Sequence, residues 1–284
     1  MKEDDKPQVL RTVSELKLWR SKRNPGSLAL VPTMGNLHAG HAALVEAARG
    51  RADRVLVSIF VNPTQFSPDE DYANYPRSLE EDLELLRECD ANAVFAPAPE
   101  EIYPLGVKRA TAIEVPAFSD LLEGASRPGH FRGVASVVVR LFNLAAPDIA
   151  VFGEKDYQQL LVIRRMVTEL FLPVEILGVP TVRASDGLAL SSRNRYLTPG
   201  ERRGAPGLHR ALTAGAEALG RGAQTAEIEL AGAAELTAAG FKVEYFAVRD
   251  AATLGAPTAG CERIILAAAR LGKARLIDSL HLPG

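Results

Sequence analysis

The sequence predicts an α/β protein with a Rossmann-like parallel sheet, helices on both faces of that sheet, and a smaller α+β domain at the C-terminal end. Two observations lead to this prediction. In the first two thirds of the chain, short apolar runs alternate with segments of helical periodicity, which is the pattern of a parallel sheet with covering helices. From about residue 181 the pattern changes to two Ala-rich helical stretches followed by three apolar strands.

The first domain is expected over residues 1–180. Its expected strands are the apolar runs 27–31, 54–61, 93–96, 112–115, 149–153 and 174–179. Ser78 begins the helical stretch SLEEDLELLREC with Glu81 three residues later, which predicts a capping box at its start. A second helix begins after Asp156, and its apolar residues cover most of its circumference, so we expect it to pack against the sheet.

The second domain is expected over residues 181–284. It contains helical stretches at about 200–219 and 225–239, and then the strands FKVEYFAV, RIILAAA and ARLID. The junction at Val179–Thr181 has no Ser- or Gly-rich spacer, so we expect the two domains to touch and to hinge.

Composition excludes several classes of protein. The chain has 284 residues, 47% of them hydrophobic, and its 33 basic and 35 acidic side chains leave a net charge of -2, which disfavours a tRNA or DNA substrate. Cys89 and Cys261 lie far apart in the sequence, so we expect buried, unpaired thiols. The N-terminus lacks the apolar stretch of a secretory signal, and no uncharged apolar run reaches membrane-spanning length, so we expect a cytoplasmic protein without a membrane partner.

The segment VPTMGNLHAGH, residues 31–41, is the first candidate for chemistry. An apolar strand runs into a turn in which Gly35 and Gly40 bracket His38, and His41 follows one helical turn later. Small residues at a helix N-terminus allow a nucleotide phosphate to approach unpaired N–H groups. The segment is not a P-loop, because His41-Ala42 stands where Lys and Ser or Thr are required, and no G-x-G-x-x-G follows any strand, which disfavours a nicotinamide enzyme.

Four further segments supply polar groups at strand ends and loops. In FVNPTQF (60–66) the neutral side-chain amides of the Asn and the Gln suit a hydroxy acid. In FGEKDYQQ (152–159) a lysine lies at a helix start, where its point charge can bind an α-phosphate. DGLALSSRN (186–194) offers hydroxyls and a guanidinium for β- and γ-phosphates, and SRPGHFRGV (126–134) forms a loop with two arginines. Each segment read singly has an ordinary structural explanation as a turn or a cap, and their convergence favours a site.

In their order and spacing, the five segments resemble the pantothenate synthetase family of the nucleotidyltransferase superfamily, whose HxGH signature stands here as His38-Ala39-Gly40-His41. The resemblance extends from Leu28 to Asp278. It implies ATP-dependent condensation of pantoate with β-alanine through a pantoyl adenylate, with release of pyrophosphate and AMP. It further implies a C-terminal domain that helps close the site, dependence on Mg²⁺, and a homodimer.

The resemblance also assigns residues. It implies that His41 is a proton donor and that Gln65 and Gln159 contact pantoate; Asn62 is a further candidate for substrate contact, and the candidates for stabilising phosphate charge are His38, His41, Lys155 and Arg193. The implied ATP contacts are Met34, Gly35, Asn36, Leu37, His38, Ala39, Gly40, His41, Gly153, Glu154, Lys155, Asp156, Val182, Leu190, Ser191, Ser192 and Arg193. Leu190 stands where many family members have Met, a near-isosteric change.

Two alternatives stay open from the sequence. One is another nucleotidyltransferase with the same HxGH loop, and the other is a nucleotide-binding module without catalysis. Gln65 and Gln159 argue against the first. We also expect the polar segment 67–77, next to Gln65, to act as a lid over the reactive adenylate, with an inert surface loop as its alternative.

Overall fold

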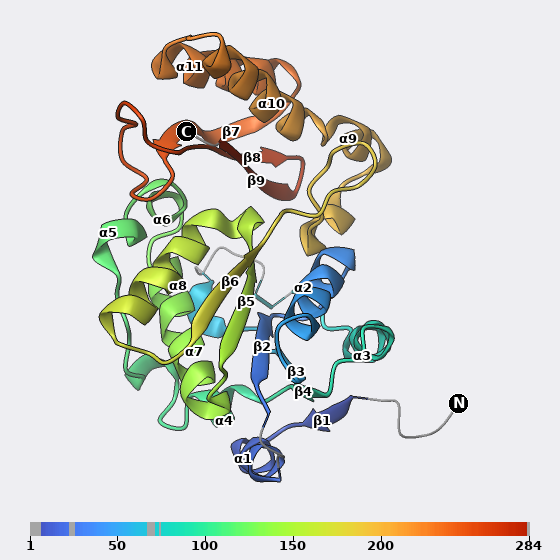
Figure 1. The fold of residues 1–284 in the computed structure, drawn as a ribbon. Helices are drawn as coiled ribbons and strands as arrows, with labels where there is room; N and C mark the ends of the chain where they lie inside the picture. Colours follow the sequence, from blue (N-terminus) through green and yellow to red (C-terminus); the bar gives the residue numbers. More distant parts are fainter. Residues whose placement is uncertain (1–6, 23–25, 67–71, 74, 283–284) are drawn as a thin grey trace. The chain divides into compact units, whose positions relative to one another are not determined.

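The computed structural model describes residues 7–22, 26–66, 72–73 and 75–282, which form two compact units (Figure 1). The larger unit contains the described residues up to Asp120 together with Arg127–Gly153 and Gln159–Val179. The smaller unit contains Pro180 and the chain that follows it, with two short segments, Leu121–Ser126 and Glu154–Gln158.

A six-stranded parallel sheet forms the centre of the larger unit, with the strand order β1-β4-β3-β2-β5-β6. Strand β2 lies between β3 and β5, and its Leu30 is paired with Leu56 on one side and Ala150 on the other. The central strands are fully buried because both faces of the sheet are covered, which explains their continuous apolar runs. The strands are β1 (Gln8–Leu10), β2 (Leu28–Thr33), β3 (Arg54–Ile59), β4 (Ala93–Phe95), β5 (Ile149–Gly153) and β6 (Glu175–Val179).

Helices cover both faces of this sheet, as the sequence predicts. Helix α2 contacts β2, β3, β5 and β6, and Val45 and Leu86 pack with the strand residues Val31 and Val94 in one core cluster. Helix α7 contacts β2 and α1. The helical segments are α1 (Val13–Ser21), α2 (Ala39–Arg49), η2 (Pro63–Gln65), α3 (Leu79–Glu88), α4 (Pro99–Ile102), η3 (Val107–Arg109), α5 (Pro116–Ser119), α6 (Leu122–Ser126), α7 (His130–Ala145), η4 (Glu154–Asp156) and α8 (Tyr157–Glu169).

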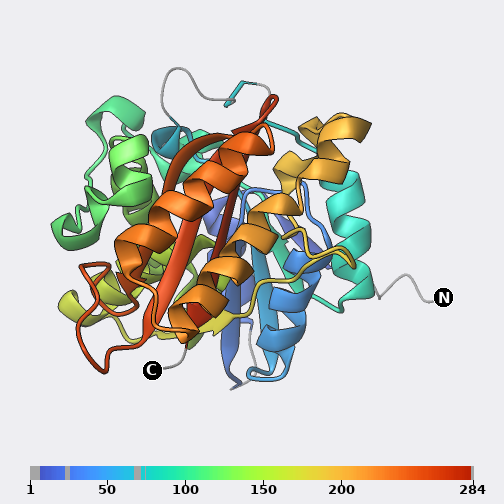
Figure 2. The ribbon, with the colours of Figure 1, turned by 90° about the horizontal axis from the view of Figure 1, so that it is seen from above.

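The smaller unit is built on an antiparallel three-stranded sheet in the order β7-β8-β9. Helices α10 and α11 lie side by side against this sheet (Figure 2), and a core that includes Leu212, Ile228, Phe246 and Ile265 fills the space between them and the strands. The elements are η5 (Ser192–Tyr196), α9 (Pro199–Gly204), α10 (Gly207–Gly220), α11 (Thr225–Ala238), β7 (Lys242–Asp250), β8 (Arg263–Leu271) and β9 (Ala274–Leu282). The α+β architecture expected for this part of the chain is confirmed.

The expected strand at 112–115 is wrong. Its backbone is bound by side chains of α7 instead of by a neighbouring strand: the Ile113 N–H donates to Ser136 Oγ at 2.8 Å, and Arg140 donates to the Thr111 carbonyl at 2.6 Å. Pro116, which begins α5, follows directly. The segment is therefore held along α7 and adds no strand to the sheet.

Three smaller expectations are also corrected, and one strand is additional. Ser78 is the N-cap of α3, but its side chain makes no capping hydrogen bond, so the capping box with Glu81 is absent. Helix α7 begins at His130, inside the expected loop 126–134. Strand β1 was not expected, because its three residues carry too little pattern. Cys89 and Cys261 are free thiols, but both are only half-buried.

The expected lid segment is described only in part, because residues 67–71 and 74 lie outside the described residues. Tyr75 is buried, and its ring contacts Phe66 with 5.8 Å between the ring centroids, so this end of the segment belongs to the core. The lid itself stays a prediction. Among the described residues, none of the helices has the length and apolar character needed to cross a membrane.

Candidate active site

The first site segment follows the end of β2. Gly35 has φ +81° and Asn36 has φ +53°, so the chain turns sharply through the left-handed region before α2 begins. A Cβ atom at Gly35 would lie 3.0 Å from Asp82 Oδ2 and 3.0 Å from a methyl group of Ile59, so glycine meets both the conformational and the steric requirement there.

The buried carboxylate of Asp82 on α3 holds this turn. Asp82 is 2% exposed, and its two oxygens accept hydrogen bonds from the backbone N–H groups of Asn36, at 2.9 Å, and Leu37, at 2.7 Å. Burial raises the pKa of the Asp82 carboxyl above its ordinary value, and the two N–H groups oppose that shift. Asp82 therefore connects α3 to the loop that precedes the histidines.

His38 and His41 form a reciprocal cap at the start of α2. His38 Nδ1 accepts from the Gly40 N–H at 3.1 Å, the His38 N–H donates to His41 Nδ1 at 3.3 Å, and the two ring centroids are 4.1 Å apart. The expectation that both imidazoles share one side of the helix start is confirmed. Because each Nδ1 is an acceptor, the proton of each neutral ring resides on Nε2. Two Nε2–H donors at a helix N-terminus suit an anionic ligand.

The second segment, the 3₁₀ turn η2, follows the end of β3. Asn62 is 1% exposed, and its amide is used within the protein: Nδ2 donates to Gln65 Oε1 and to the Gly133 carbonyl, while Oδ1 accepts from Thr64 and Tyr103. Gln65 is 8% exposed, and its Nε2 lies 2.7 Å from the sulfur of Met34 in the histidine loop. Two of the predicted site segments are thus in direct contact within the larger unit.

The third segment follows β5, which pairs with β2 in the same parallel sheet. The carboxyl ends of β2, β3 and β5 lie at the same edge, where ligands of open α/β sheets bind. Gly153 is the last residue of β5, and Gln159 lies in the first turn of α8. The histidine loop, Gln65 and Gln159 are therefore all placed at this one edge of the sheet.

The remaining predicted ATP contacts belong to the smaller unit. Val182 and Leu190 face each other across a short hairpin, in which the Leu190 N–H donates to the Val182 carbonyl at 3.0 Å. Ser191 caps the following turn η5 by accepting from the Arg193 N–H at 3.3 Å. The structure thus brings together five of the predicted residues, namely Val182, Leu190, Ser191, Ser192 and Arg193.

Two adjacent residues of β9 hold the two segments of this unit that carry predicted ATP contacts, the hairpin 182–190 and the turn η4. Asp278 is 3% exposed and forms a bidentate pair with Arg183 of the hairpin, at 2.6 Å and 2.9 Å. Ser279 Oγ donates to the Glu154 carbonyl in η4 at 3.1 Å. The turn η4 carries Lys155, whose Nζ lies 3.8 Å from Asp156 Oδ2. One strand therefore holds the lysine turn and the serine–arginine hairpin.

Comparison with known proteins identifies the family. A family profile described as pantoate–β-alanine ligase matches residues 8–281. The chain belongs to the pantoate–β-alanine ligase family. It is 52% identical over 278 residues to the pantothenate synthetase of Pseudomonas savastanoi pv. phaseolicola, with 96% of this chain and 98% of the relative covered. It is 54% identical over 282 residues to that of Nitrosococcus oceani, with 97% and 98% covered.

Solved structures of pantoate–β-alanine ligases share the fold. The crystal structure of pantothenate synthetase from Thermus thermophilus superposes with a TM-score of 0.89 at 50% identity, covering 98% of this chain and 100% of the other. A pantoate–β-alanine ligase from Francisella tularensis, crystallised with β-γ ATP and β-alanine, superposes with a TM-score of 0.83 at 32% identity and 97% coverage of both chains.

The sequence did not indicate that Asp82, Asp278 and Ser279 hold the loops that carry the candidate site residues. A signal for Asp82 exists: it lies three residues after Leu79 and four before Leu86, on the apolar face of α3, where an unpartnered carboxylate would be costly. Asp278 and Ser279 give no comparable signal, because their partners Arg183 and Glu154 lie far away in the sequence.

Proposed function

We propose that this protein joins pantoate to β-alanine with ATP as co-substrate, through a pantoyl adenylate, with release of pyrophosphate and AMP. The observation that carries the proposal is the contact between the HxGH loop and the turn η2. Met34 lies in the loop that leads to His38 and His41, and its sulfur lies 2.7 Å from Gln65 Nε2. A phosphate site beside a neutral amide suits a reaction between ATP and a small hydroxy acid. Family membership and the ATP- and β-alanine-bound relative support the same conclusion.

In the first step, the pantoate carboxylate attacks the α-phosphorus of ATP in line, a P–O bond forms, and pyrophosphate leaves with the electron pair of the broken P–O bond. We assign His38 and His41 to the charge that develops on phosphate oxygens, since each offers an Nε2–H donor at the positive end of α2. Lys155 and Arg193 are assigned to the same task as a point charge and a bidentate fork. His41 is the proposed proton donor.

In the second step, the neutral amine of β-alanine attacks the acyl carbon of the adenylate. The C–N bond forms, the C–O bond to AMP breaks, and the amine gives up a proton as the amide appears. AMP is a far better leaving group than the oxygen of a free carboxylate, which is why adenylation precedes amide formation.

Gln65 and Gln159 are the proposed pantoate contacts, because side-chain amides both donate to a carboxylate and accept from hydroxyls. For Asn62 the proposed role is indirect: its amide hydrogen-bonds to Gln65, Gly133, Thr64 and Tyr103 and so holds the turn that carries Gln65. The remaining ATP contacts are proposed as family membership implies.

We also propose that Mg²⁺ accompanies ATP. Within the described ranges, no group of three or more His, Cys, Asp or Glu side chains is arranged to hold a metal ion, and such a cage is not required, because Mg²⁺ in ATP-dependent enzymes is bound largely by phosphate oxygens and water. When bound, Mg²⁺ neutralises charge on the departing pyrophosphate. A homodimer in the cytoplasm is proposed on family membership alone, and light scattering during size-exclusion chromatography tests the dimer.

AMP formation in the presence of ATP and Mg²⁺ tests the function. We expect AMP and pantothenate in equal amounts, and only when pantoate and β-alanine are both present. AMP transfer to a different acceptor would indicate another HxGH nucleotidyltransferase. ATP binding without turnover under any of these conditions would indicate a non-catalytic module.

A further inference from the structure

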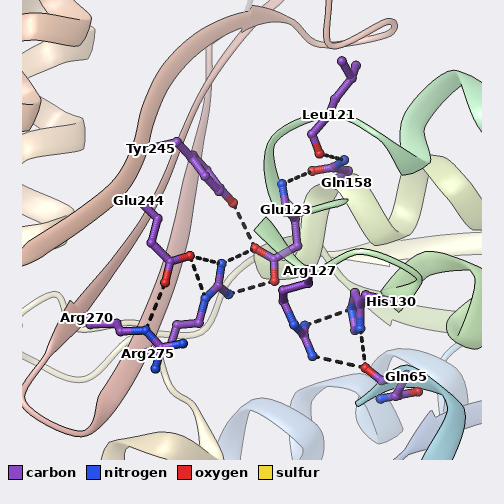
Figure 3. A network of polar contacts seen from close by, with 10 residues as sticks. All are labelled: Gln65, Leu121, Glu123, Arg127, His130, Gln158, Glu244, Tyr245, Arg270 and Arg275. Carbon is purple, nitrogen blue, oxygen red and sulfur yellow. Dashed lines mark hydrogen bonds and ion pairs between the residues drawn. The ribbon is translucent and has the colours of Figure 1, made fainter. Parts of the chain in front are cut away.

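The backbone carbonyl of Gln65 accepts hydrogen bonds from two side chains, those of Arg127 just before α7 and of His130, the first residue of α7 (Figure 3). His130 Nδ1 lies 2.9 Å from this oxygen, and Arg127 Nη2 donates to it at 3.3 Å. Arg127 Nη1 also lies 3.0 Å from His130 Nε2. Arg127, His130 and the Gln65 carbonyl therefore form a closed three-membered network, which we call the Gln65 clamp.

The partners in the Gln65 clamp fix the state of the imidazole. A carbonyl oxygen only accepts, so Nδ1 of His130 must carry a proton, and a guanidinium only donates, so Nε2 must present its lone pair to Arg127. Only the neutral Nδ1–H tautomer satisfies both contacts. His130 is 8% exposed, which keeps water from replacing either partner.

The same segment holds the turn η2 at close range. A Cβ atom at Gly133 would lie 2.3 Å from the Thr64 carbonyl oxygen and 2.7 Å from Gln65 Cα, so the turn packs directly on the helix backbone. Asn62 Nδ2 donates to the Gly133 carbonyl at 3.1 Å and to Gln65 Oε1 at 3.2 Å. The backbone and the side chain of Gln65 are thus both held from α7.

We propose that Arg127 and His130 are positioning residues, which orient the Gln65 amide for pantoate by fixing the Gln65 backbone. The inference rests on the proposed function, because it takes pantoate as the ligand of Gln65. In this role neither Arg127 nor His130 has to touch the substrate. A small rotation of the Gln65 peptide would displace its amide, and misplacement of a binding group weakens binding even when every group is present.

Isothermal titration of the full-length protein with pantoate tests the inference. His130→Ala removes the donor to Gln65 and should weaken pantoate binding by about 2- to 12-fold, the range of one net hydrogen bond. His130→Asn is the matched variant, because its Nδ2 replaces Nδ1 as a donor, and it should bind pantoate more tightly than His130→Ala. The affinity for a non-hydrolysable ATP analogue should stay within about twofold in both variants.

A double-mutant cycle separates positioning through Gln65 from a general structural effect. In a Gln65→Ala background, His130→Ala should cause no further loss of pantoate affinity, because the amide that it orients is gone. An equal loss in both backgrounds, a parallel loss of ATP-analogue affinity, or unchanged pantoate binding in His130→Ala would each overturn the inference. If His130→Ala does not fold, Arg127→Lys serves in its place, since one ammonium group cannot reproduce the forked contact. Failure of the unmodified protein to bind pantoate would instead contradict the proposed function.

Discussion

The imidazole of His41 is held by the backbone of His38: His41 Nδ1 accepts the His38 N–H at 3.3 Å, while His38 Nδ1 accepts the N–H of Gly40 at 3.1 Å. The HxGH spacing therefore serves the local structure as well as the chemistry. Loss of one ring removes a donor and also loosens the start of α2, and a substitution that keeps the cap separates the two effects.

The pair His41→Ala and His41→Asn makes that separation. Alanine loses the cap and the Nε2–H donor, whereas the Asn carbonyl oxygen stands in for Nδ1 and keeps the cap. Pantoate-dependent exchange of pyrophosphate into ATP should fall by about 10²- to 10³-fold in both variants, as expected for one lost transition-state donor. Only His41→Ala should lose about 0.5–2 kcal/mol of stability in urea unfolding. Near-normal exchange in His41→Asn would show that the ring has only a capping role.

Asp82→Asn tests the loop clamp on α3. The Asn amide presents an NH₂ group to one of the two backbone N–H donors, so that donor is left buried without an acceptor, at a cost of about 1–3 kcal/mol in folding free energy. We expect weaker ATP binding as well, because the residues that lead to His38 lose their anchor. Glu81→Gln, an exposed change of the same chemistry one residue earlier, is the control and should alter neither quantity. Equal effects of the two substitutions would contradict the clamp.

Asp278→Asn tests the anchor of the hairpin. It leaves the Arg183 guanidinium without its bidentate carboxylate, and breaking such a buried pair costs about 3–5 kcal/mol. We expect the lower end of this range, because the Arg183 side chain is 19% exposed. Thermal unfolding measures the loss, and nucleotide binding should weaken with it. Glu262→Gln, which breaks an exposed pair with His281, is the matched control, and a loss as small as that of the control would refute the anchoring role.

The pH dependence of stability should report His209. Burial, with a smaller contribution from Arg183, lowers the pKa of His209 below its ordinary value of 6.5, while Asp278 opposes the shift. Between the lowered value and 6.5 the unfolded chain binds more protons than the folded one, so the free energy of unfolding should decrease as the pH falls through that window. His209→Gln should flatten this part of the curve. An unchanged slope in His209→Gln would exclude His209 as its source.

Much of the fold is predictable from the sequence because its signals are local. Five of the six expected strands of the first domain form. The inner strands are apolar runs whose burial on both sheet faces matches their composition, whereas β6 lies at the sheet edge and is only partly buried. The run 112–115 is also apolar, but the N–H of its Ile113 is bound by Ser136 of α7, a partner 23 residues away in the sequence. The cap formed by His38 and His41 is predictable, because both partners lie within one helical turn of each other in the sequence.

The α/β class can be read from periodicity, because periodicity is a property of neighbouring residues, and the family from the resemblance of five motifs to pantothenate synthetases. The contacts that hold the site loops in place are visible only in the folded chain. Asp82 reaches Asn36, Asp278 reaches Arg183, and His130 reaches Gln65, and in each pair the partners are separated by dozens of residues. Such contacts form only when the sheet brings distant segments together, and their partners therefore cannot be identified from the local sequence.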